Sequence, residues 1–189
     1  MWRERLVHFF DEHKKPEWRY AHAYRIYHLA RELDSEKLCD DDILFAASIL
    51  HDIGAYPQYK EEGIDHAVTS TQFCKDFLKE IGFPGSKMDS VLNAIEMHMH
   101  YSKPGPGLEA ILIRDADILD FIGTIGIARA FLKAQDDLRA GYQELSKLAE
   151  ELPGKAVSEK GRALALERRQ EILTFLDKLV HDSFGGKFL

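Results

Sequence analysis

The chain of 189 residues has little cysteine and no long hydrophobic run. It has two cysteines, Cys39 and Cys74, and they lack the close spacing of zinc-binding pairs. This favours free thiols in a reducing compartment over a disulfide framework. No apolar run approaches the roughly 20 residues that span a bilayer. The charged N-terminal segment lacks the apolar centre of a secretory signal. We therefore expect a cytoplasmic protein that does not enter a membrane.

Positive charge is also scarce. The chain has 25 lysines and arginines against 32 aspartates and glutamates, for a formal net charge of -7. Because phosphate backbones attract basic surfaces, this balance predicts no stable complex with nucleic acid. A small phosphorylated substrate is still compatible with the sequence, since a metal ion and a few local basic residues can neutralise it.

Helical periodicity dominates the hydrophobic pattern, and strand patterns are sparse. The sequence predicts an all-α, single-domain bundle of about seven to eight helices. Asp40 to Asp42 supply an N-cap for the third helix, Gly54 fits a glycine stop at its end, and "SKPGPG" (102–107) interrupts the chain. The expected helices cover residues 2–13, 18–33, 43–53, 65–81, 86–100, 108–123, 126–152 and 158–182.

The stretch "ILHDIG" places His51 and Asp52 at the end of an apolar helix. Burying a carboxylate without a partner is costly, so we expect a counter-charge or a metal ion nearby. Taken alone, a His-Asp pair is a weak signal, because a short motif counts only in its structural context.

Three further residues stand out. His22 lies at the start of the second helix, and Asp117 and Asp120 share one face of the most apolar helix, "LEAILIRDADILDFIG". Acidic groups on a core helix and a buried His-Asp pair compensate each other best around one divalent cation. Imidazole and carboxylate ligands without thiolates favour a transition metal over a closed structural zinc site.

Four blocks of the sequence resemble the HD superfamily of metal-dependent phosphohydrolases: "ILHDIG", "DHAVTSTQF", "AIEMHMHYS" and "DADILDFIGTIGIARAF". Within it they are similar to the small bacterial YedJ-like and YpgQ-like hydrolases. The resemblance runs from about Trp18 to Phe131, and later residues match only as helices. It implies one HD-type domain over residues 1–189, with a core at about 18–131 and C-terminal helices at about 126–182 packing on it.

The resemblance implies a metal site and a reaction. The matching ligands are His22, His51, Asp52 and Asp117, which would hold a divalent ion, with Mn favoured over Mg, Fe, Ni, Co or Zn. The implied reaction is hydrolysis, by metal-bound water, of a phosphoester or phosphoanhydride bond. The expected partner is a small phosphorylated substrate, a nucleotide being favoured, and a homodimer is compatible with the sequence.

His66 and His98 fall between Asp52 and Asp117, in an order that resembles the two-metal branches of the superfamily. They would form a second metal site, or bind phosphate and move protons; the plain alternative is that they line a cavity or cap helices. Asp120 would orient a ligand histidine. The predicted catalytic set is Asp52, His66, His98 and Asp120.

Phosphate binding falls to Arg25, one helical turn after His22, and to Lys60 in the loop after the His-Asp pair. The alternative for both is a solvated surface charge. Arg129 is expected to be a structural partner of a buried carboxylate. Tyr56, Tyr59 and Tyr101 lie in the two loops expected near the site, where they would stack on a base or cover the core.

Two other functions compete with hydrolysis. One is a non-catalytic module that keeps the metal for structure and senses a ligand or binds a partner. A fully protein-coordinated ion would favour this module, whereas an open coordination position with phosphate access would favour hydrolysis. The third-ranked reading is an HD oxygenase, which would need a di-iron centre and more carboxylate ligands than the sequence offers.

Overall fold

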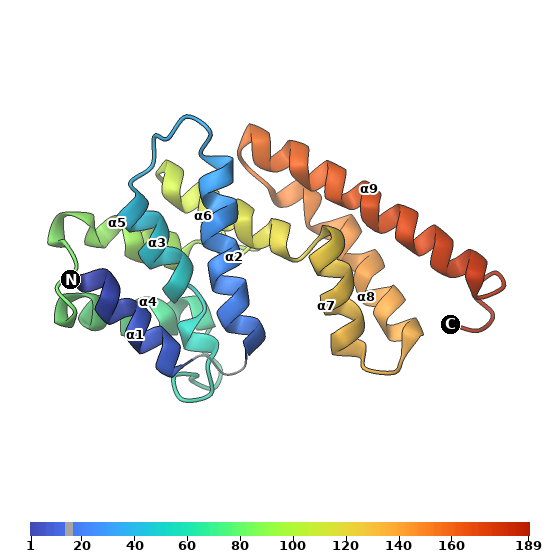
Figure 1. The fold of residues 1–189 in the computed structure, drawn as a ribbon, viewed down its shortest axis with the longest axis horizontal. Helices are drawn as coiled ribbons and strands as arrows, with labels where there is room; N and C mark the ends of the chain where they lie inside the picture. Colours follow the sequence, from blue (N-terminus) through green and yellow to red (C-terminus); the bar gives the residue numbers. More distant parts are fainter. Residues whose placement is uncertain (14–16) are drawn as a thin grey trace. The chain divides into compact units, whose positions relative to one another are not determined.

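The computed structural model describes residues 1–13 and 17–189. Over these residues it contains nine α-helices, three short 3-10 helices (η) and no strand, which confirms the all-α prediction with one helix more than expected (Figure 1). The helices are α1 (Trp2–Glu12), α2 (Glu17–Leu33), α3 (Asp41–Leu50), η1 (Ile53–Ala55), α4 (His66–Glu80), η2 (Gly85–Lys87), α5 (Met88–Glu96), α6 (Leu108–Asp120), α7 (Gly123–Ala134), α8 (Leu138–Glu151), η3 (Pro153–Lys155) and α9 (Glu159–Asp182).

The chain divides into two compact units, Met1–Asp117 and Ile118–Leu189. The boundary falls near the end of α6. The expectation of one domain, with the C-terminal helices packed on the core, stays a prediction. No helix of the described ranges is long and apolar enough to cross a membrane.

In the first unit, α3 is the central helix and packs against α2 and α5. The side chain of Asp40 accepts a hydrogen bond from the Asp42 backbone N–H at 2.9 Å, as predicted for the N-cap. Every residue from Ile43 to Leu50 is buried. The helix is therefore held inside the unit along its length, and its C-terminal end delivers His51 and Asp52 to the interior.

The end of α3 differs from the prediction. The helix stops at Leu50 instead of Ile53, and Gly54 belongs to η1 without a positive φ angle. A Cβ atom at Gly54 would lie 2.1 Å from Thr69 Oγ1 and 2.5 Å from the His66 carbonyl oxygen. A glycine is needed at position 54 because η1 lies directly against the start of α4. The Gly54 N–H donates a hydrogen bond to Ser70 Oγ on α4 at 2.9 Å.

Other helix boundaries were also predicted wrongly, among them the end of the helix predicted over 108–123, which stops at Asp120, and two further differences are larger. The helix expected over 86–100 ends at Glu96, which leaves His98 in the following loop. The single helix expected over 126–152 is interrupted after α7, where Gln135 takes a left-handed φ of 57°. Asp137 then caps α8 by accepting a hydrogen bond from the Ala140 N–H at 2.9 Å.

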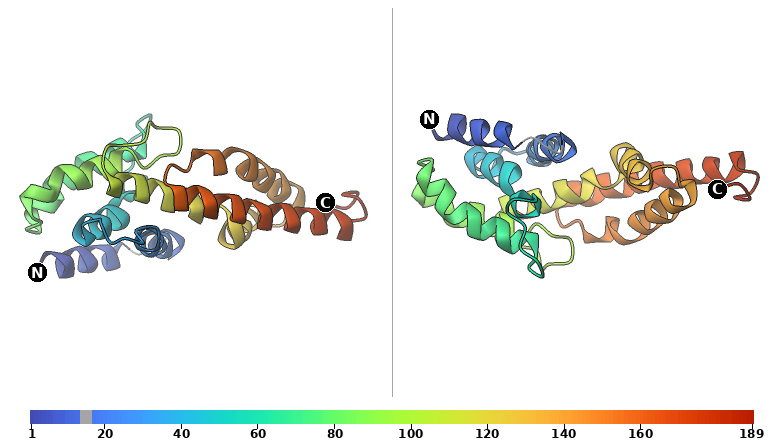
Figure 2. Two further views of the ribbon diagram at one scale, coloured as in Figure 1. Left: turned by 90° about the horizontal axis from the view of Figure 1, so that it is seen from above. Right: turned by 90° about the horizontal axis from the view of Figure 1, so that it is seen from below.

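The second unit is a bundle in which α7, α8 and α9 pack against one another (Figures 1 and 2). A Cβ atom at Gly141 would lie 2.5 Å from the Phe131 ring, so α7 and α8 approach closely at this point. The long helix α9 begins at Ser158, whose hydroxyl accepts a hydrogen bond from the Gly161 N–H. The distance between two packed helix axes depends on the size of the side chains at the contact, and a glycine allows a short distance.

Candidate metal centre

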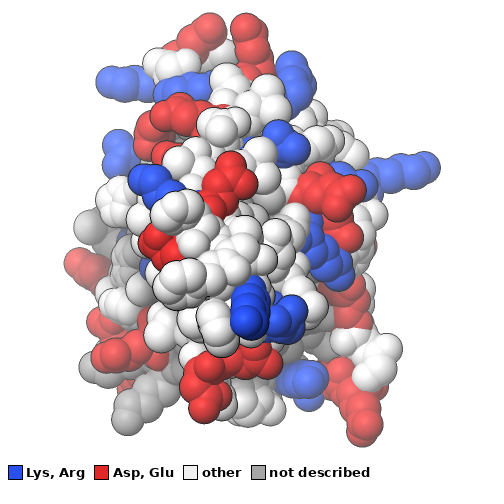
Figure 3. Space-filling view, turned by 90° about the vertical axis from the view of Figure 1, so that its right-hand side faces the viewer, with Lys and Arg blue, Asp and Glu red and all other residues white. Residues whose placement is uncertain are grey.

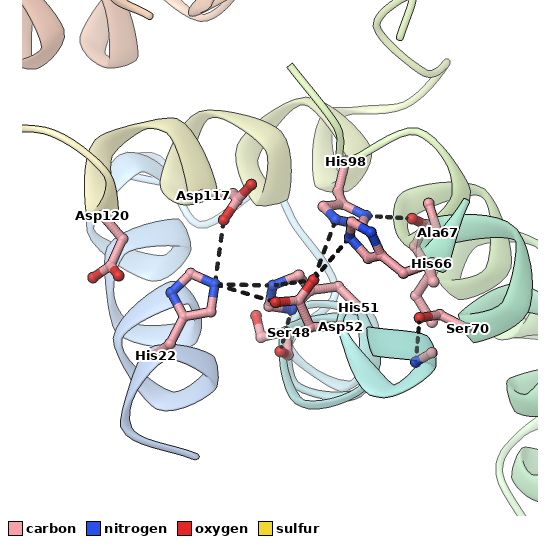
Figure 4. A network of polar contacts seen from close by, with 12 residues as sticks. His22, Ser48, His51, Asp52, His66, Ala67, Ser70, His98, Asp117 and Asp120 are labelled. Carbon is pink, nitrogen blue, oxygen red and sulfur yellow. Dashed lines mark hydrogen bonds and ion pairs between the residues drawn. The ribbon is translucent and has the colours of Figure 1, made fainter. Parts of the chain in front are cut away.

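Three side chains from two elements converge inside the first unit. His22 comes from α2, and His51 and Asp52 follow α3; their ligand atoms all lie within 4.8 Å of one another. His22 Nε2 is 3.2 Å from His51 Nε2, 3.9 Å from Asp52 Oδ2 and 3.3 Å from Asp117 Oδ1 on α6 (Figure 4). The structure thus brings together the four residues predicted as metal ligands, with Asp117 joined to the group through His22.

A second group of ligand atoms meets the first at Asp52. It consists of Asp52, His66 and His98, again within 4.8 Å of one another. Asp52 Oδ1 lies 3.1 Å from His66 Nε2 and 3.7 Å from His98 Nε2 (Figure 4). His66 is the first residue of α4, so the close contact of η1 with α4 at Gly54 is what sets it beside Asp52.

Backbone carbonyls orient two of the imidazoles. His51 Nδ1 lies 2.8 Å from the Ser48 oxygen, and His98 Nδ1 lies 2.6 Å from the Ile95 oxygen. A carbonyl oxygen only accepts, so Nδ1 carries the hydrogen and donates it. In the neutral ring the lone pair is then on Nε2, the atom that faces the cluster, as in metal-binding histidines.

Burial and neighbouring charges shift the titration of the cluster. Burial lowers the pKa of His51 to about 4, which keeps its ring neutral near pH 7. Burial alone raises the pKa of Asp52, but the three surrounding imidazoles outweigh it and hold that pKa well below its usual value. For Asp117, burial likewise raises the pKa, and the contact with His22 overcomes it, so the net shift is downward. Both carboxylates are therefore ionised near neutral pH.

These residues fit a divalent cation. Ligand atoms about 2.1 Å from a six-coordinate ion lie about 3 Å from their neighbours, which matches the separations of 3.2 and 3.3 Å around His22 Nε2. His98 Nε2 is buried and has no hydrogen-bond partner among the described residues. A buried imidazole nitrogen without a hydrogen-bond partner is costly unless it binds something. Imidazole nitrogens with carboxylates form a donor set that suits transition metals.

Arg114 on α6 supports the loop that carries His98. Its guanidinium is buried and donates hydrogen bonds to the Met99 and His100 carbonyl oxygens, the latter at 2.7 Å. In the same loop, the Tyr101 hydroxyl donates to Asp65, the N-cap of α4. The irregular segment after α5 is therefore fixed from two elements, which holds His98 in place although it lies outside a helix.

The remaining predicted residues have different surroundings. Asp120 is buried and accepts a hydrogen bond from Arg129, so Arg129 is the carboxylate partner that the sequence predicted. Arg25 is half-buried on α2 and interacts within the protein, and Lys60 is exposed in the loop after η1. The catalytic role of Asp120 and the phosphate-binding roles of Arg25 and Lys60 stay predictions.

Sequence reasoning missed Arg19. It lies on α2, and its guanidinium carbon is 5.4 Å from the centroid of the Tyr56 ring. Tyr56, expected in an open loop, is 1% exposed, so its ring has no free face for a base. The sequence did contain a signal for Arg19, namely its spacing from His22. Arg19 lies three positions before His22, and Arg25 lies three positions after it.

Known proteins resemble this chain in sequence and in fold. The model of the HD domain family matches residues 19–122. A structure from an uncultured Thermotogales bacterium, described as a predicted HD superfamily hydrolase, aligns with a TM-score of 0.68 at 25% identity over 94% of this chain and 88% of that one. Bacillus subtilis YpgQ in complex with ADP aligns with a TM-score of 0.71 at 24% identity over 95% and 93%.

Among curated proteins, ribonuclease Y of Clostridium botulinum is 26% identical over 152 residues. This match covers 80% of the present chain and 28% of the length of ribonuclease Y. The chain therefore corresponds to less than a third of that relative.

Proposed function

Because the chain belongs to the HD domain family and has the fold of HD-superfamily hydrolases, we propose that it is a metal-dependent phosphohydrolase. The proposed substrate is a small phosphorylated compound, a nucleotide being favoured, cleaved at a phosphoester or phosphoanhydride bond. The observation that carries this proposal is the convergence of His22, His51 and Asp52, with ligand atoms within 4.8 Å of one another in a buried site. The ADP in the YpgQ structure supports a nucleotide ligand.

The proposed metal ligands are His22, His51, Asp52 and Asp117, and Mn²⁺ is the favoured ion. These residues would hold a divalent cation, which when bound would lower the pKa of a water molecule towards neutrality and polarise a phosphoryl oxygen. The protein fixes the donors beforehand, because the Ser48 carbonyl orients the His51 ring and α3 is buried along its length. Little rearrangement is then required when the ion binds.

His66 is the favoured group for moving a proton. Its Nε2 lies 3.1 Å from Asp52 Oδ1, and its side chain is 28% exposed, whereas His98 beside it is buried. His66 can therefore reach a leaving oxygen while Asp52 orients its ring. The supporting roles proposed for His98, Asp120, Arg25 and Lys60 rest on the sequence predictions.

The likeness to ribonuclease Y raises nucleic acid as a second substrate class. The net charge of -7 argues against it. On the face seen in Figure 3, basic and acidic side chains are interspersed, whereas nucleic-acid binders gather basic side chains into a stripe or patch. A free nucleotide in the cytoplasm is therefore preferred over a polymer.

The test is metal analysis followed by a Mn²⁺-supplemented screen of nucleotides and phosphoesters for released phosphate or pyrophosphate. We expect bound metal and turnover in the wild type, with both lost in Asp52→Ala, because this carboxylate belongs to both groups of ligand atoms. Asp76→Ala is the matched control, since Asp76 is 90% exposed on the same unit. Bound metal with no turnover on any phosphorylated compound would favour the sensing module instead.

A further inference from the structure

Helix α2 carries two arginines that lie on tyrosine rings in the same way. Near its start, the Arg19 guanidinium carbon is 5.4 Å from the Tyr56 centroid, and near its end the Arg31 guanidinium carbon is 5.4 Å from the Tyr27 centroid. Each pair combines a fixed positive charge with an adjacent phenol. The two pairs therefore provide an internal comparison within one helix.

The two pairs differ in what they bind. At the end of α2, a single carboxylate serves both groups, since Arg31 Nε is 3.4 Å from Asp41 Oδ1 and the Tyr27 hydroxyl donates to that oxygen at 2.7 Å. At the start of α2, within the described part of the chain, Arg19 makes ring contacts but neither an ion pair nor a hydrogen bond. Over the same residues, the Tyr56 hydroxyl is buried without a hydrogen-bond partner.

A buried hydroxyl without a hydrogen-bond partner costs free energy of folding. An acceptor placed beside Arg19 and Tyr56 would remove this cost. The acceptor that satisfied the matching pair is an oxyanion, the carboxylate of Asp41. Arg19 needs the same kind of group because a guanidinium has five donors and no acceptor. An oxyanion from outside the chain would complete the Arg19 and Tyr56 pair as Asp41 completes the other.

The pair lies beside the candidate metal centre. Arg19 precedes His22 by three residues, which places the two about one turn apart on the same face of α2. Tyr56 follows Asp52 by four residues across η1. Burial raises the pKa of the Tyr56 hydroxyl to about 12, with Arg19 lowering it and Asp52 raising it, so this hydroxyl is within electrostatic reach of both charges.

We propose that Arg19 and Tyr56 form a phosphate-binding subsite that holds a phosphate group of the substrate next to the metal centre. The inference rests on the proposed phosphohydrolase function and assigns phosphate recognition to residues other than Arg25 and Lys60. The planar guanidinium can donate two parallel hydrogen bonds to a phosphate, and its contact with the Tyr56 ring fixes its orientation. The phenol hydroxyl donates a third.

The experiment compares Arg19→Gln with Arg31→Gln in the Mn²⁺-loaded full chain. Calorimetric titration with ADP, with inorganic phosphate and with adenosine measures binding, and metal analysis measures bound Mn²⁺. Loss of hydrogen bonds to a charged group predicts about 10- to 100-fold weaker ADP and phosphate binding in Arg19→Gln. Adenosine binding and Mn²⁺ content should not change. Arg31→Gln, which removes the same cation from a ring on the same helix, should bind all three as the wild type does.

Two further variants separate the parts of the subsite. Arg19→Lys keeps the charge without the planar fork and should recover part of the affinity. Tyr56→Phe keeps the ring under Arg19, removes the hydroxyl, and should weaken phosphate binding by a smaller factor than Arg19→Gln.

The outcomes separate this inference from the proposed function. Wild-type affinity for ADP and phosphate in Arg19→Gln overturns the subsite while leaving the phosphohydrolase in place. Arg19-dependent phosphate binding in a protein that cleaves no phosphorylated compound supports the subsite and overturns the hydrolase. A wild type that binds neither ADP nor phosphate overturns both.

Discussion

The two units of the chain bury negative charge in different ways. In the first unit, Asp52 and Asp117 lie among imidazoles, and His51 is neutral near pH 7 because burial lowers its pKa to about 4. In the second unit, the buried carboxylate of Asp120 accepts a hydrogen bond from the guanidinium of Arg129. In the first unit the carboxylates lie among imidazoles, which carry no permanent charge, and in the second unit a carboxylate is paired with a permanent cation.

The difference separates a binding site from a structural ion pair. A carboxylate that is neutralised by an arginine does not need a cation from solution. Removing one partner of such a buried pair lowers the stability of the protein. Carboxylates among imidazoles keep their negative charge and have nitrogen ligands beside them, so a divalent cation is the natural complement. Burial of an aspartate is thus weak evidence for a metal site, and the charge of its neighbours decides.

The largest effect on stability should come from breaking the ion pair of the second unit. Arg129→Met leaves the buried Asp120 carboxylate without its guanidinium and should lower the free energy of unfolding by about 3 kcal/mol. Urea unfolding of the metal-free protein measures the loss. The Mn²⁺ content of the folded variant should equal that of the wild type.

Two variants control this result. The double change Arg129→Met with Asp120→Leu removes both charges and should recover most of the lost stability. Asp52→Ala should show the opposite profile, with metal binding lost and metal-free stability little changed. Equal stability of Arg129→Met and the wild type would contradict the view that this pair is structural.

A smaller effect should follow from separating the two groups of ligand atoms at Gly54. In Gly54→Ala the new Cβ collides with the His66 carbonyl oxygen and the Ser70 backbone nitrogen, at 2.5 and 2.6 Å. Overpacking should cost about 1–3 kcal/mol of unfolding free energy. Because α4 must move away from η1, the contact of His66 with Asp52 should lengthen and Mn²⁺ affinity should fall.

Gly85→Ala is the matched control for this change. Gly85 also lies in a 3-10 helix of the first unit, and a Cβ atom there has nothing within 4 Å. Its stability and metal affinity should stay near those of the wild type. If Gly54→Ala behaves like Gly85→Ala in both measurements, the close approach does not position His66.

The smallest effect concerns an ordinary surface network of the first unit, in which Asp42 meets Lys87 and Arg3. The hydrogen bond from Lys87, with help from Arg3, lowers the pKa of Asp42. A carboxyl with a lowered folded-state pKa stabilises the protein above its unfolded pKa of about 3.9, and this stabilisation is lost as the pH falls through the folded value.

Lys87→Gln should therefore lower the melting temperature slightly at pH 7, and the difference from the wild type should shrink as the solution is acidified. Thermal unfolding followed by circular dichroism at a series of pH values tests this. A difference that grows on acidification would reverse the assigned sign. The candidate metal centre is not involved, because the network lies at the start of α3 and the candidate centre at its end.

Local sequence patterns were enough to predict some of the helices. The Asp40 cap and the apolar run after it identified α3, and the apolar surroundings of Asp117 identified α6 as a core helix. The break at Gln135 was not predictable, because a left-handed φ at a glutamine depends on tertiary packing that no local pattern records. For the same reason, Gly54 was read as a helix stop although its role is a close contact with α4.

The candidate site shows the same division. His22, His51, Asp52 and Asp117 were proposed as ligands from their setting and a family resemblance. Packing brings the two histidines together although they are 29 positions apart in the sequence. Arg19 could not be found in this way. Arg19 stands out because, in the described structure, no carboxylate pairs with its guanidinium. The sequence does not show which charges lie next to each other in space, so it could not reveal this.

The bonds from His51 and His98 to the carbonyls of Ser48 and Ile95 limit which mutations these positions can accept. Each ring gives a hydrogen to its own backbone through Nδ1 on one edge and turns Nε2 toward Asp52 on the other. An asparagine amide reaches only as far as the first edge, and a glutamine amide only as far as the second. Neither histidine therefore has a conservative substitute. Any single replacement loses either the hydrogen bond to the backbone carbonyl or the nitrogen that faces the cluster.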